Sequence, residues 1–458
     1  MERTVCVIGL GKLGACIAAC FADKGVSVVG VDINEETVRY INRGHSPIRE
    51  PGLEDLIARN RARLRATSDH AEALQESDVS FIVVPTPSQD QGGFSLRLVV
   101  EAANRIGAAL KYKNDYHLVV LTSTVLPGST EHAIIPILEQ ESGKRCGVDF
   151  GVCYSPEFIA LGTVIHDFFN PDLLLIGESD EKAGALLMNL YKSVCDNDPP
   201  VARMNFVNAE LAKLSLNAFV TMKITFANML AELCENLPGG DVDAVTGAIG
   251  LDRRIGTRYF QGSMGYGGPC FPRDNLALAY VARQLGCPPL LAQATDAYNR
   301  SILNRIAGKI QEQVPNGARV AILGLAYKAD TDVIDESPGL QLAERLADLG
   351  LHPVVYDPLA LDNARRVLGN MVEYAPSVES AVANTDLVVI ANRDREFESL
   401  ALGHAIGTPP RVLDAWRLLR RGMVDLPVGY SAIGLGDHQV AASEAVNRLV
   451  RQTLGAQV

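Results

Sequence analysis

The residues with the clearest chemical potential form a glycine-rich stretch that ends in a cysteine, Gly265-Tyr266-Gly267-Gly268-Pro269-Cys270. Its glycines allow the backbone to approach another group closely. If a helix begins at this point, its first amides lower the pKa of the Cys270 thiol from the reference value of about 8.5. Asp274 would then share a helical face with Cys270. The pattern predicts a nucleophilic thiolate, and a buried structural cysteine after a glycine turn is the alternative.

Lys213 and Asn217 lie four residues apart in an apolar segment, 211–219, that predicts a helix. Residues at this spacing share one helical face. A lysine in such surroundings either extends its ammonium to water or has a buried anionic partner. An ammonium beside an amide donor would also stabilise a developing oxyanion.

A second glycine-rich segment, Gly9-Leu10-Gly11-Lys12-Leu13-Gly14, lies between an expected strand, Val5–Ile8, and an expected helix, Lys12–Lys24. Its glycines allow close approach to a pyrophosphate, and the helix N-terminus supplies amide donors. Asp32 ends the next strand, where a carboxylate accepts hydrogen bonds from ribose hydroxyls and repels a 2′-phosphate. The combination predicts a dinucleotide site that prefers NAD to NADP. A glycine turn needed only for helix–strand packing is the alternative.

Apolar runs typical of strands buried on both faces of a parallel sheet alternate with helical segments in the first part of the chain. These runs are Val5–Ile8, Val26–Asp32, Phe81–Val84, Leu118–Leu121, Gly151–Tyr154 and Leu173–Ile176. The pattern changes near residue 205. Residues 205–236 contain no glycine or proline and predict one long helix, with further helices to about residue 313.

A second alternating stretch follows, with expected strands at Val320–Gly324, Val354–Pro358, Leu387–Ile390 and Arg411–Asp414. The sequence therefore predicts an α/β protein with two doubly wound Rossmann-like domains, 1–204 and 317–458. An all-helical central domain with a long helix, 205–313, joins them. The last domain lacks a full glycine fingerprint, because Gly324-Leu325-Ala326 has no second glycine.

Composition narrows the class of protein. The 458 residues carry a formal net charge of −12, which argues against broad nucleic-acid binding but allows a small anionic ligand. The sequence contains no run of about 18 apolar residues, so no membrane span is expected. The strand expected at the N-terminus leaves no room for a signal peptide. The nine cysteines form no CxxC pair or Cys/His cluster, so neither a metal site nor a disulfide framework is expected. We expect a cytoplasmic enzyme that contacts neither nucleic acid nor membrane.

Over nearly its whole length the sequence resembles the UDP-glucose/GDP-mannose dehydrogenases, or nucleotide-sugar 6-dehydrogenases. The resemblance rests on motifs in one order: Gly9–Gly14, Pro47–Gly52, Thr86–Ser88, Ser123–Gly128, Ser155–Phe158, Lys213 with Asn217, Gly265–Asp274, and Ala326–Thr331 with Glu336–Pro338. It implies NAD on the first domain, the nucleotide of a nucleotide sugar on the last, and a dimer interface on the long central helix. UDP-glucose is the default substrate.

The resemblance also implies a mechanism in which two NAD and one water oxidise carbon 6 of the sugar to a carboxylate. Cys270 would trap the aldehyde as a thiohemiacetal and then carry a thioester, which hydrolyses more readily than an ester. Lys213 and Asn217 would hold the oxyanion, and Asp274, Thr124 and Glu157 would order or activate water. Further cofactor contacts would come from Thr86, Pro87 and Thr124. Further substrate contacts would come from Glu157, Phe158, Arg254 (to the neighbouring subunit's substrate), Tyr259, Phe260, Gly267, Tyr327, Lys328 and Arg417.

Several positions depart from the family pattern. Leu161 replaces a second glutamate, Asp172-Leu173 replaces Asp-Arg, Asp335 replaces an arginine near the cofactor, and Asp414-Ala415-Trp416-Arg417 replaces Asp-Gly-Arg-Asn. Arg417 would substitute for the arginine from one position away, or Trp416 would stack on a ring of the ligand. The alternative is that Trp416 packs beneath the domain. The thiol chemistry is untouched, and the identity of the sugar and nucleotide stays open.

Three functions fit these observations. The first is an active four-electron dehydrogenase of UDP-glucose, a UDP-N-acetylhexosamine, a UDP-galactose-type sugar or GDP-mannose. The second is a non-catalytic nucleotide-sugar-binding paralogue, against which the retained Cys270, Lys213 and Asp274 count. The third is a two-electron β-hydroxyacid dehydrogenase, which would need neither Cys270 nor a second α/β domain.

Overall fold

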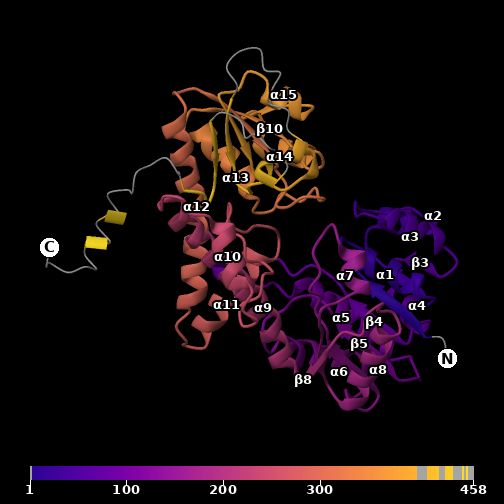
Figure 1. Ribbon diagram of the computed structural model, residues 1–458. Helices are drawn as coiled ribbons and strands as arrows, with labels where there is room; N and C mark the ends of the chain where they lie inside the picture. Colours follow the sequence, from indigo (N-terminus) through magenta and orange to yellow (C-terminus); the bar gives the residue numbers. More distant parts are fainter. Residues whose placement is uncertain (1–2, 400–409, 422–428, 437–445, 448–449, 452–458) are drawn as a thin grey trace. The chain divides into compact units, whose positions relative to one another are not determined.

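The computed structural model describes residues 3–399, 410–421, 429–436, 446–447 and 450–451 (Figure 1). Its internal contacts divide the chain into two compact units. The first unit contains residues 1–216 and 280–287, and the second contains residues 217–279 and 288–458. Two helices, α9 (Phe206–Glu235) and α11 (Phe271–Gln284), contribute residues to both units.

The first unit is built on an eight-stranded sheet with the order β3-β2-β1-β4-β5-β6-β7-β8. Neighbouring strands run parallel except β6 and β7, which are antiparallel. The strands are β1 (Thr4–Ile8), β2 (Ser27–Val31), β3 (Leu64–Thr67), β4 (Val79–Ile82), β5 (His117–Leu121), β6 (Phe150–Tyr154), β7 (Leu174–Glu178) and β8 (Val201–Met204).

Both faces of this sheet are covered, as the apolar strands predict. Successive residues of a strand point to opposite faces. Accordingly, Val5 and Val7 of β1 belong to one buried cluster with α1, whereas Cys6 and Ile8 belong to another with α5. The helices are α1 (Gly14–Asp23), α2 (Glu35–Arg43), α3 (Leu53–Arg59), α4 (His70–Gln75), α5 (Arg97–Leu110), α6 (Ile135–Ser142), α7 (Val164–Phe169) and α8 (Glu181–Lys192).

The second unit combines central helices with a six-stranded parallel sheet of order β11-β10-β9-β12-β13-β14. Besides its parts of α9 and α11, the central helices are α10 (Val242–Gly250) and α12 (Leu290–Gln313). The sheet and its helices are β9 (Arg319–Leu323), α13 (Pro338–Asp348), β10 (His352–Tyr356), α14 (Leu361–Leu368), β11 (Glu373–Tyr374), α15 (Val378–Val382), β12 (Leu387–Ile390), β13 (Arg411–Asp414) and β14 (Tyr430–Ala432). Two sheets with a helical region between them along the chain confirm the predicted fold class.

The two sheets share one feature at the loop after their first strand. A Cβ added to Gly14, at the start of α1, would overlap the carbonyl oxygen of Gly9. A Cβ added to Gly339, in the first turn of α13, would likewise overlap the carbonyl oxygen of Gly324. The second sheet therefore also has a helix-packing glycine, although it lacks the second glycine of the fingerprint. It lies farther along the chain because the intervening loop, 325–338, is longer.

Helix α9 spans 30 residues and is, by length and composition, apolar enough to cross a membrane. A buried helix of a soluble protein passes the same test, and no other helix in the described ranges does. The buried residues of α9 include Glu210, Lys213 and Asn217, whose polar atoms are hydrogen-bonded within the protein. We therefore interpret α9 as the central helix that the sequence predicts.

Candidate active site

The glycine loop after β1 leaves room for a ligand. Gly9 has a φ of +92°, and a Cβ there would lie 2.5 Å from the carbonyl oxygen of Val83, so a side chain is excluded. At Gly11 an added Cβ would meet no described atom within 4 Å. Lys12 is exposed, and Leu13 precedes α1 and packs partly against the core. The open backbone at Gly11, in front of a helix N-terminus, fits a pyrophosphate.

Asp32 follows β2 and faces the same loop. Its carboxylate accepts hydrogen bonds from the amide of Leu10 at 2.7 Å and from that of Asn34 at 2.8 Å. These bonds fix the carboxylate beside the glycine loop. Each carboxylate oxygen accepts more than one hydrogen bond, so Asp32 retains capacity for ribose hydroxyls.

Thr86 and Thr124 follow β4 and β5 at the same edge of the sheet. The buried Thr86 hydroxyl donates to the carbonyl oxygen of Thr124 at 2.7 Å, and Pro87 beside it is exposed. Because β1 and β4 are neighbours, this edge is the switch point where doubly wound sheets bind nucleotides. The predicted cofactor residues of the first unit therefore gather at one place and fit NAD, which accepts a hydride when bound.

Lys213 is 6% exposed and does not extend to water. Its Nζ donates to the carbonyl oxygen of Glu157 at 2.7 Å and lies 4.6 Å from the ring centroid of Phe158. The ammonium is therefore buried, and its charge acts on the buried carboxyl group of Glu157, which is the anionic partner that the sequence left open. Three of the predicted site residues thus meet in the first unit.

Glu157 also approaches Tyr191, whose hydroxyl donates to its carboxylate at 3.4 Å. Burial raises the pKa of Glu157 to about 7, and the charge of Lys213 and the Tyr191 hydrogen bond oppose that rise. A carboxyl group with a pKa near neutrality changes protonation easily at working pH, as a general acid or base requires.

One buried carboxylate near this group was missed in the sequence. Glu210 lies on α9 one turn before Lys213 and is 0% exposed. It binds the loop after β5 through Gly128 and Thr130, and burial raises its pKa. An acidic residue inside an apolar helix was the available signal.

In the second unit, Cys270 directly precedes α11 and is exposed. The amide of Asp274 donates to the carbonyl oxygen of Cys270 at 2.8 Å, which is the first turn of that helix. Asp274 is buried, and its carboxylate accepts a 2.6 Å hydrogen bond from the side-chain amide of Asn217. The predicted helix start after the glycine loop is therefore present, and Asn217 and Asp274 are partners.

The glycine loop before Cys270 packs against the 325–338 loop of the same unit. The amide of Gly268 donates to the carbonyl oxygen of Asp335 at 2.9 Å, and a Cβ on Gly268 would lie 2.7 Å from the ring of Tyr327. A Cβ on Gly267 would overlap the carbonyl oxygen of Glu336. These glycines are thus required by contacts within the protein. Tyr327 and Lys328 lie in the same 325–338 loop, and both are partly buried.

The other predicted substrate residues lie in the 252–260 segment. Tyr259 is 53% exposed, has a φ of +57° and contacts the ring of Phe271 edge-on at 5.9 Å. Phe260 is buried and stacks on Phe226. Arg254 is exposed and pairs with Asp252 at 2.7 Å. A non-glycine residue with positive φ is uncommon and is often found at functional sites.

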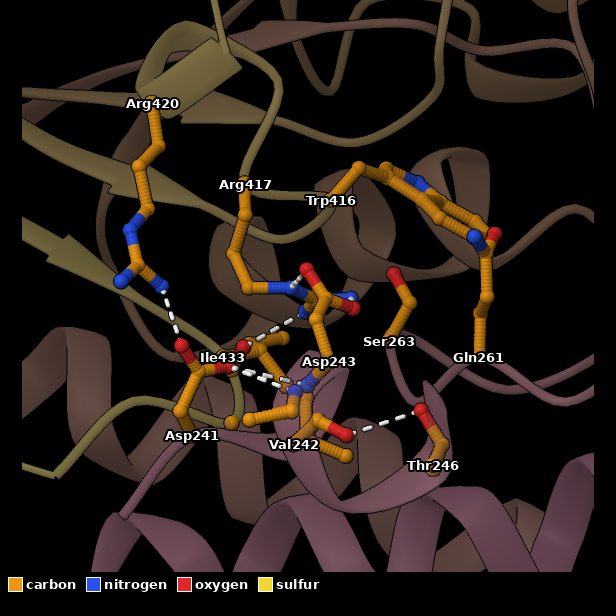
Figure 2. Close-up of polar contacts among 12 residues, drawn as sticks. Asp241, Val242, Asp243, Thr246, Gln261, Ser263, Trp416, Arg417, Arg420 and Ile433 are labelled. Atoms are coloured by element: carbon orange, nitrogen blue, oxygen red, sulfur yellow. Dashed lines mark hydrogen bonds and ion pairs between the residues drawn. The ribbon is translucent and has the colours of Figure 1, made fainter. Parts of the chain in front are cut away.

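Arg417 is predicted to contact the substrate, but in the structure its side chain is buried in contacts within the protein. It is 1% exposed, and its Nε and Nη2 pair with the carboxylate of Asp243 at 2.8 and 3.0 Å (Figure 2). Its Nη1 donates to the carbonyl oxygen of Ile433 at 2.7 Å. The residue has a φ of +57°, a left-handed backbone conformation that is uncommon outside glycine.

Two other departures from the family pattern have structural consequences. Leu161 packs partly buried against the core of the first unit, where a glutamate would be poorly solvated. Asp335 is exposed and contributes its backbone carbonyl to Gly268. Nothing in the structure explains the change at Asp172-Leu173.

The predicted catalytic residues are divided between the units. Thr124, Glu157 and Lys213 belong to the first unit. Asn217, Cys270 and Asp274 belong to the second. Within each unit the structure brings two of them together, Lys213 with Glu157 and Asn217 with Asp274.

Three family models match the chain in order along its length. They are the NAD binding domain of the UDP-glucose/GDP-mannose dehydrogenase family over residues 3–195, the central domain over 207–301, and the UDP binding domain over 321–421.

Individual relatives agree with this assignment. A UDP-glucose 6-dehydrogenase of Haloferax volcanii is 40% identical over 398 residues, 86% of this chain and 92% of the relative. A GDP-mannose 6-dehydrogenase of Pseudomonas putida is 36% identical over 416 residues, 87% of this chain and 93% of the relative. The solved structure of a UDP-glucose dehydrogenase from Pyrobaculum islandicum has a TM-score of 0.85 and 35% identity, covering 95% of this chain and 97% of that one. The chain therefore belongs to the UDP-glucose/GDP-mannose dehydrogenase family and is an NAD-dependent nucleotide-sugar dehydrogenase.

Proposed function

We propose that this enzyme oxidises the carbon-6 alcohol of UDP-glucose to the carboxylate of UDP-glucuronate. The observation that carries the four-electron chemistry is Cys270, an exposed thiol at the first turn of α11 with the Asp274–Asn217 pair one turn behind it. The choice of UDP-glucose rests on the resemblance to the UDP-glucose 6-dehydrogenase of Haloferax volcanii. A helix N-terminus favours a thiolate over a thiol, and a thiolate is the form that attacks an aldehyde.

The reaction balances as one alcohol, one water and two NAD⁺ giving one carboxylate, two NADH and three protons. The first hydride leaves carbon 6 and produces an aldehyde, to which the Cys270 sulfur adds. Loss of a second hydride from that thiohemiacetal gives a thioester. Water then attacks the thioester carbon, the carbon–sulfur bond breaks, and the thiol is regenerated.

Lys213 and Glu157 have distinct roles in this scheme. The Lys213 ammonium stabilises the oxyanion that forms when sulfur or water adds to the carbonyl carbon. Glu157, whose pKa burial raises to about 7, accepts a proton from the attacking water. Asn217 adds an amide donor for the oxyanion, and Asp274 and Thr124 order water.

GDP-mannose is the second candidate substrate. A GDP-mannose 6-dehydrogenase of Pseudomonas putida is 36% identical to this chain, close to the 40% of the UDP-glucose enzyme of Haloferax volcanii. The thiol chemistry is the same for both sugars, so only the nucleotide and sugar contacts differ. UDP-N-acetylhexosamines are further alternatives.

The deciding experiment supplies a panel of nucleotide sugars with NAD⁺ and counts NADH by absorbance. We expect two NADH per UDP-glucose and no free aldehyde. One NADH per sugar with accumulating aldehyde would point to a two-electron enzyme. No NADH with any sugar, together with tight nucleotide-sugar binding, would identify a non-catalytic paralogue.

We also infer a cytoplasmic homodimer formed through α9. Phe219, Phe226 and Leu233 recur every seven residues on this helix and are 62%, 47% and 52% exposed. A repeat of seven places all three on one helical face, and a contiguous exposed apolar face is typical of an interaction site. A second copy of the chain, presenting the same face, would cover it.

A further inference from the structure

Arg417 belongs to a pair of ion contacts that tie α10 to the end of β13. Arg417 holds Asp243 through both nitrogens of its fork, and Arg420 holds Asp241 at 2.7 Å (Figure 2). Asp241 caps α10, and Asp243 lies in its first turn. Buried arginine with a bidentate carboxylate partner is a structural contact. The guanidinium of Arg417 is therefore committed inside the protein.

The neighbouring residue, Trp416, does not share the contacts of Arg417. Its Nε1 donates to the carbonyl oxygen of Ala391 at 2.9 Å, and its ring packs partly against the core of the second unit. Ala391 directly follows β12, whereas Trp416 follows β13. The indole therefore bridges the carboxyl ends of two neighbouring strands.

The second cation at this edge is Arg393. Its guanidinium carbon lies 4.8 Å from the centroid of the Trp416 ring, and its Nη1 donates to Oε1 of Gln261 at 2.8 Å. Arg393 is exposed and is the third residue after β12. Stacking on an indole fixes the plane of a guanidinium, and a guanidinium held in a fixed plane is suited to bind phosphate oxygens.

The position of Arg393 is that of a ligand contact. β9 and β12 are neighbours in the sheet, while β10 and β11 extend the other way from β9, so the β9–β12 boundary is the switch point. Ligands of such sheets bind outside the carboxyl ends at this boundary. The acidic residue after β10 is Asp357, which is 3% exposed. Its carboxylate accepts hydrogen bonds from the amides of Leu325 and Ala326 at 2.7 and 2.9 Å, so it is directed into the protein and not toward a ligand.

We propose that Arg393, oriented by Trp416 and Gln261, binds the diphosphate of the nucleotide sugar, whereas Arg417 only holds α10 to the sheet. This assignment rests on the proposed function and names the residue that replaces the family's arginine. A guanidinium is suited to a diphosphate, because its fork matches two phosphate oxygens.

The test measures binding by calorimetry in the absence of NAD, so that no turnover is needed. Arg393→Ala should weaken UDP binding by about 10-fold or more, which is the usual effect of losing a charged hydrogen bond. The matched control is Arg395→Ala, an exposed arginine two residues away, which should change the affinity less than 2-fold. Arg417→Lys should lower the melting temperature and leave the UDP affinity of the folded protein unchanged.

Inorganic pyrophosphate, which has no base, is the second probe. Arg393→Ala should weaken pyrophosphate binding as it weakens UDP binding. A loss for UDP alone would mean that Arg393 contacts the base and would overturn the diphosphate assignment. Wild-type affinity in Arg393→Ala, or a loss of affinity without loss of stability in Arg417→Lys, would also overturn it.

The same titrations separate this inference from the proposed function. If the wild type binds GDP but not UDP, the proposed nucleotide is wrong. The effect of Arg393→Ala is then measured on the affinity for GDP. If the wild type binds UDP and Arg393→Ala binds it equally well, only the role of Arg393 fails. If the wild type binds neither nucleotide, both proposals fail.

Discussion

Thr130 donates two hydrogen bonds to the carboxylate of Glu210, one from its amide at 2.8 Å and one from its hydroxyl at 2.6 Å. The amide of Gly128 adds a third at 2.5 Å. This carboxylate therefore joins the first turns of α9 to the loop after β5. That loop carries Thr124, and the next turn of α9 carries Lys213.

Replacing Glu210 by glutamine should destabilise the protein by about 1.5–3 kcal/mol, because buried donors lose a charged acceptor. Urea unfolding measures this loss. Turnover of the folded variant should also fall, since the turn of α9 before Lys213 is then held less firmly to the loop after β5. Glu131→Gln, an exposed glutamate beside Thr130, is the control and should behave as the wild type. A Glu210→Gln variant of unchanged stability would show that the contact contributes nothing.

Activity should rise with pH through about 7, the value to which burial raises the pKa of Glu157, because the carboxylate form accepts the proton from water. The pH profile of kcat measures this limb, which should disappear in Glu157→Gln. A limb retained in that variant would assign the titration to another group.

The raised pKa of Glu157 should affect the stability of the protein in the opposite direction to its activity as the pH rises. The folded pKa lies above the ordinary value of 4.5, so folding favours the protonated form. This contribution is complete below about pH 4.5 and is lost as the pH rises through about 7. The difference in unfolding free energy between the wild type and Glu157→Gln, measured at several pH values, reports it.

Asp32→Ala should relax the preference for NAD over NADP, because the carboxylate that repels a 2′-phosphate is removed. The ratio of kcat/KM for the two cofactors should move by about 10-fold or more toward NADP, the scale of one charge contact. A wild type with equal efficiency for both cofactors would deny Asp32 this role.

Lys213→Ala should lower kcat by about 100- to 1,000-fold, the usual effect of removing one oxyanion donor. Substrate affinity should change much less, because the charge that the ammonium stabilises grows only in the transition state. Steady-state kinetics with direct binding measurements distinguish the two. Normal turnover with weaker binding would make Lys213 a plain binding residue.

Phe219→Lys should shift the protein toward the monomer, because a charge would be placed in an apolar interface. Light scattering after size-exclusion chromatography measures the mass. Lys12→Ala, which changes an exposed residue of the first unit far along the sequence, should leave the mass unchanged. If wild type and Phe219→Lys are both monomeric, α9 is not the interface.

The central strands and the glycine loops were predictable because their signals are local. Buried strands such as Leu387–Ile390 are continuous apolar runs, and the helix after Cys270 follows a glycine loop. The strands missed in the sequence, β3, β8, β11 and β14, lie at or near the sheet edges or are only two to four residues long. Such strands are partly exposed and carry polar residues, so their pattern resembles a loop.

The side-chain contacts were less predictable because they depend on residues distant in sequence. Nothing local tells that Arg417 finds Asp243, 174 positions earlier, or that Arg393 finds Gln261, 132 positions earlier. The left-handed backbone at Arg417 was equally unpredictable, because the sequence contains no glycine there to signal it. The chemical role of a side chain could be predicted from its residue type, whereas its orientation and its partners could be known only from the folded structure.

The paired glycines of the two sheets have a consequence for engineering. In each sheet the first strand and the following helix touch through backbone at Gly9 with Gly14 and at Gly324 with Gly339. The loop between each pair is therefore not what holds helix to strand. The loop is short in the first sheet and longer in the second, where it spans residues 325–338. A side chain at Gly14 or at Gly339 should therefore not be tolerated, because it would overlap the backbone at the end of the first strand. The loop between Gly324 and Gly339 has a separate task, since it packs against the glycine loop before Cys270.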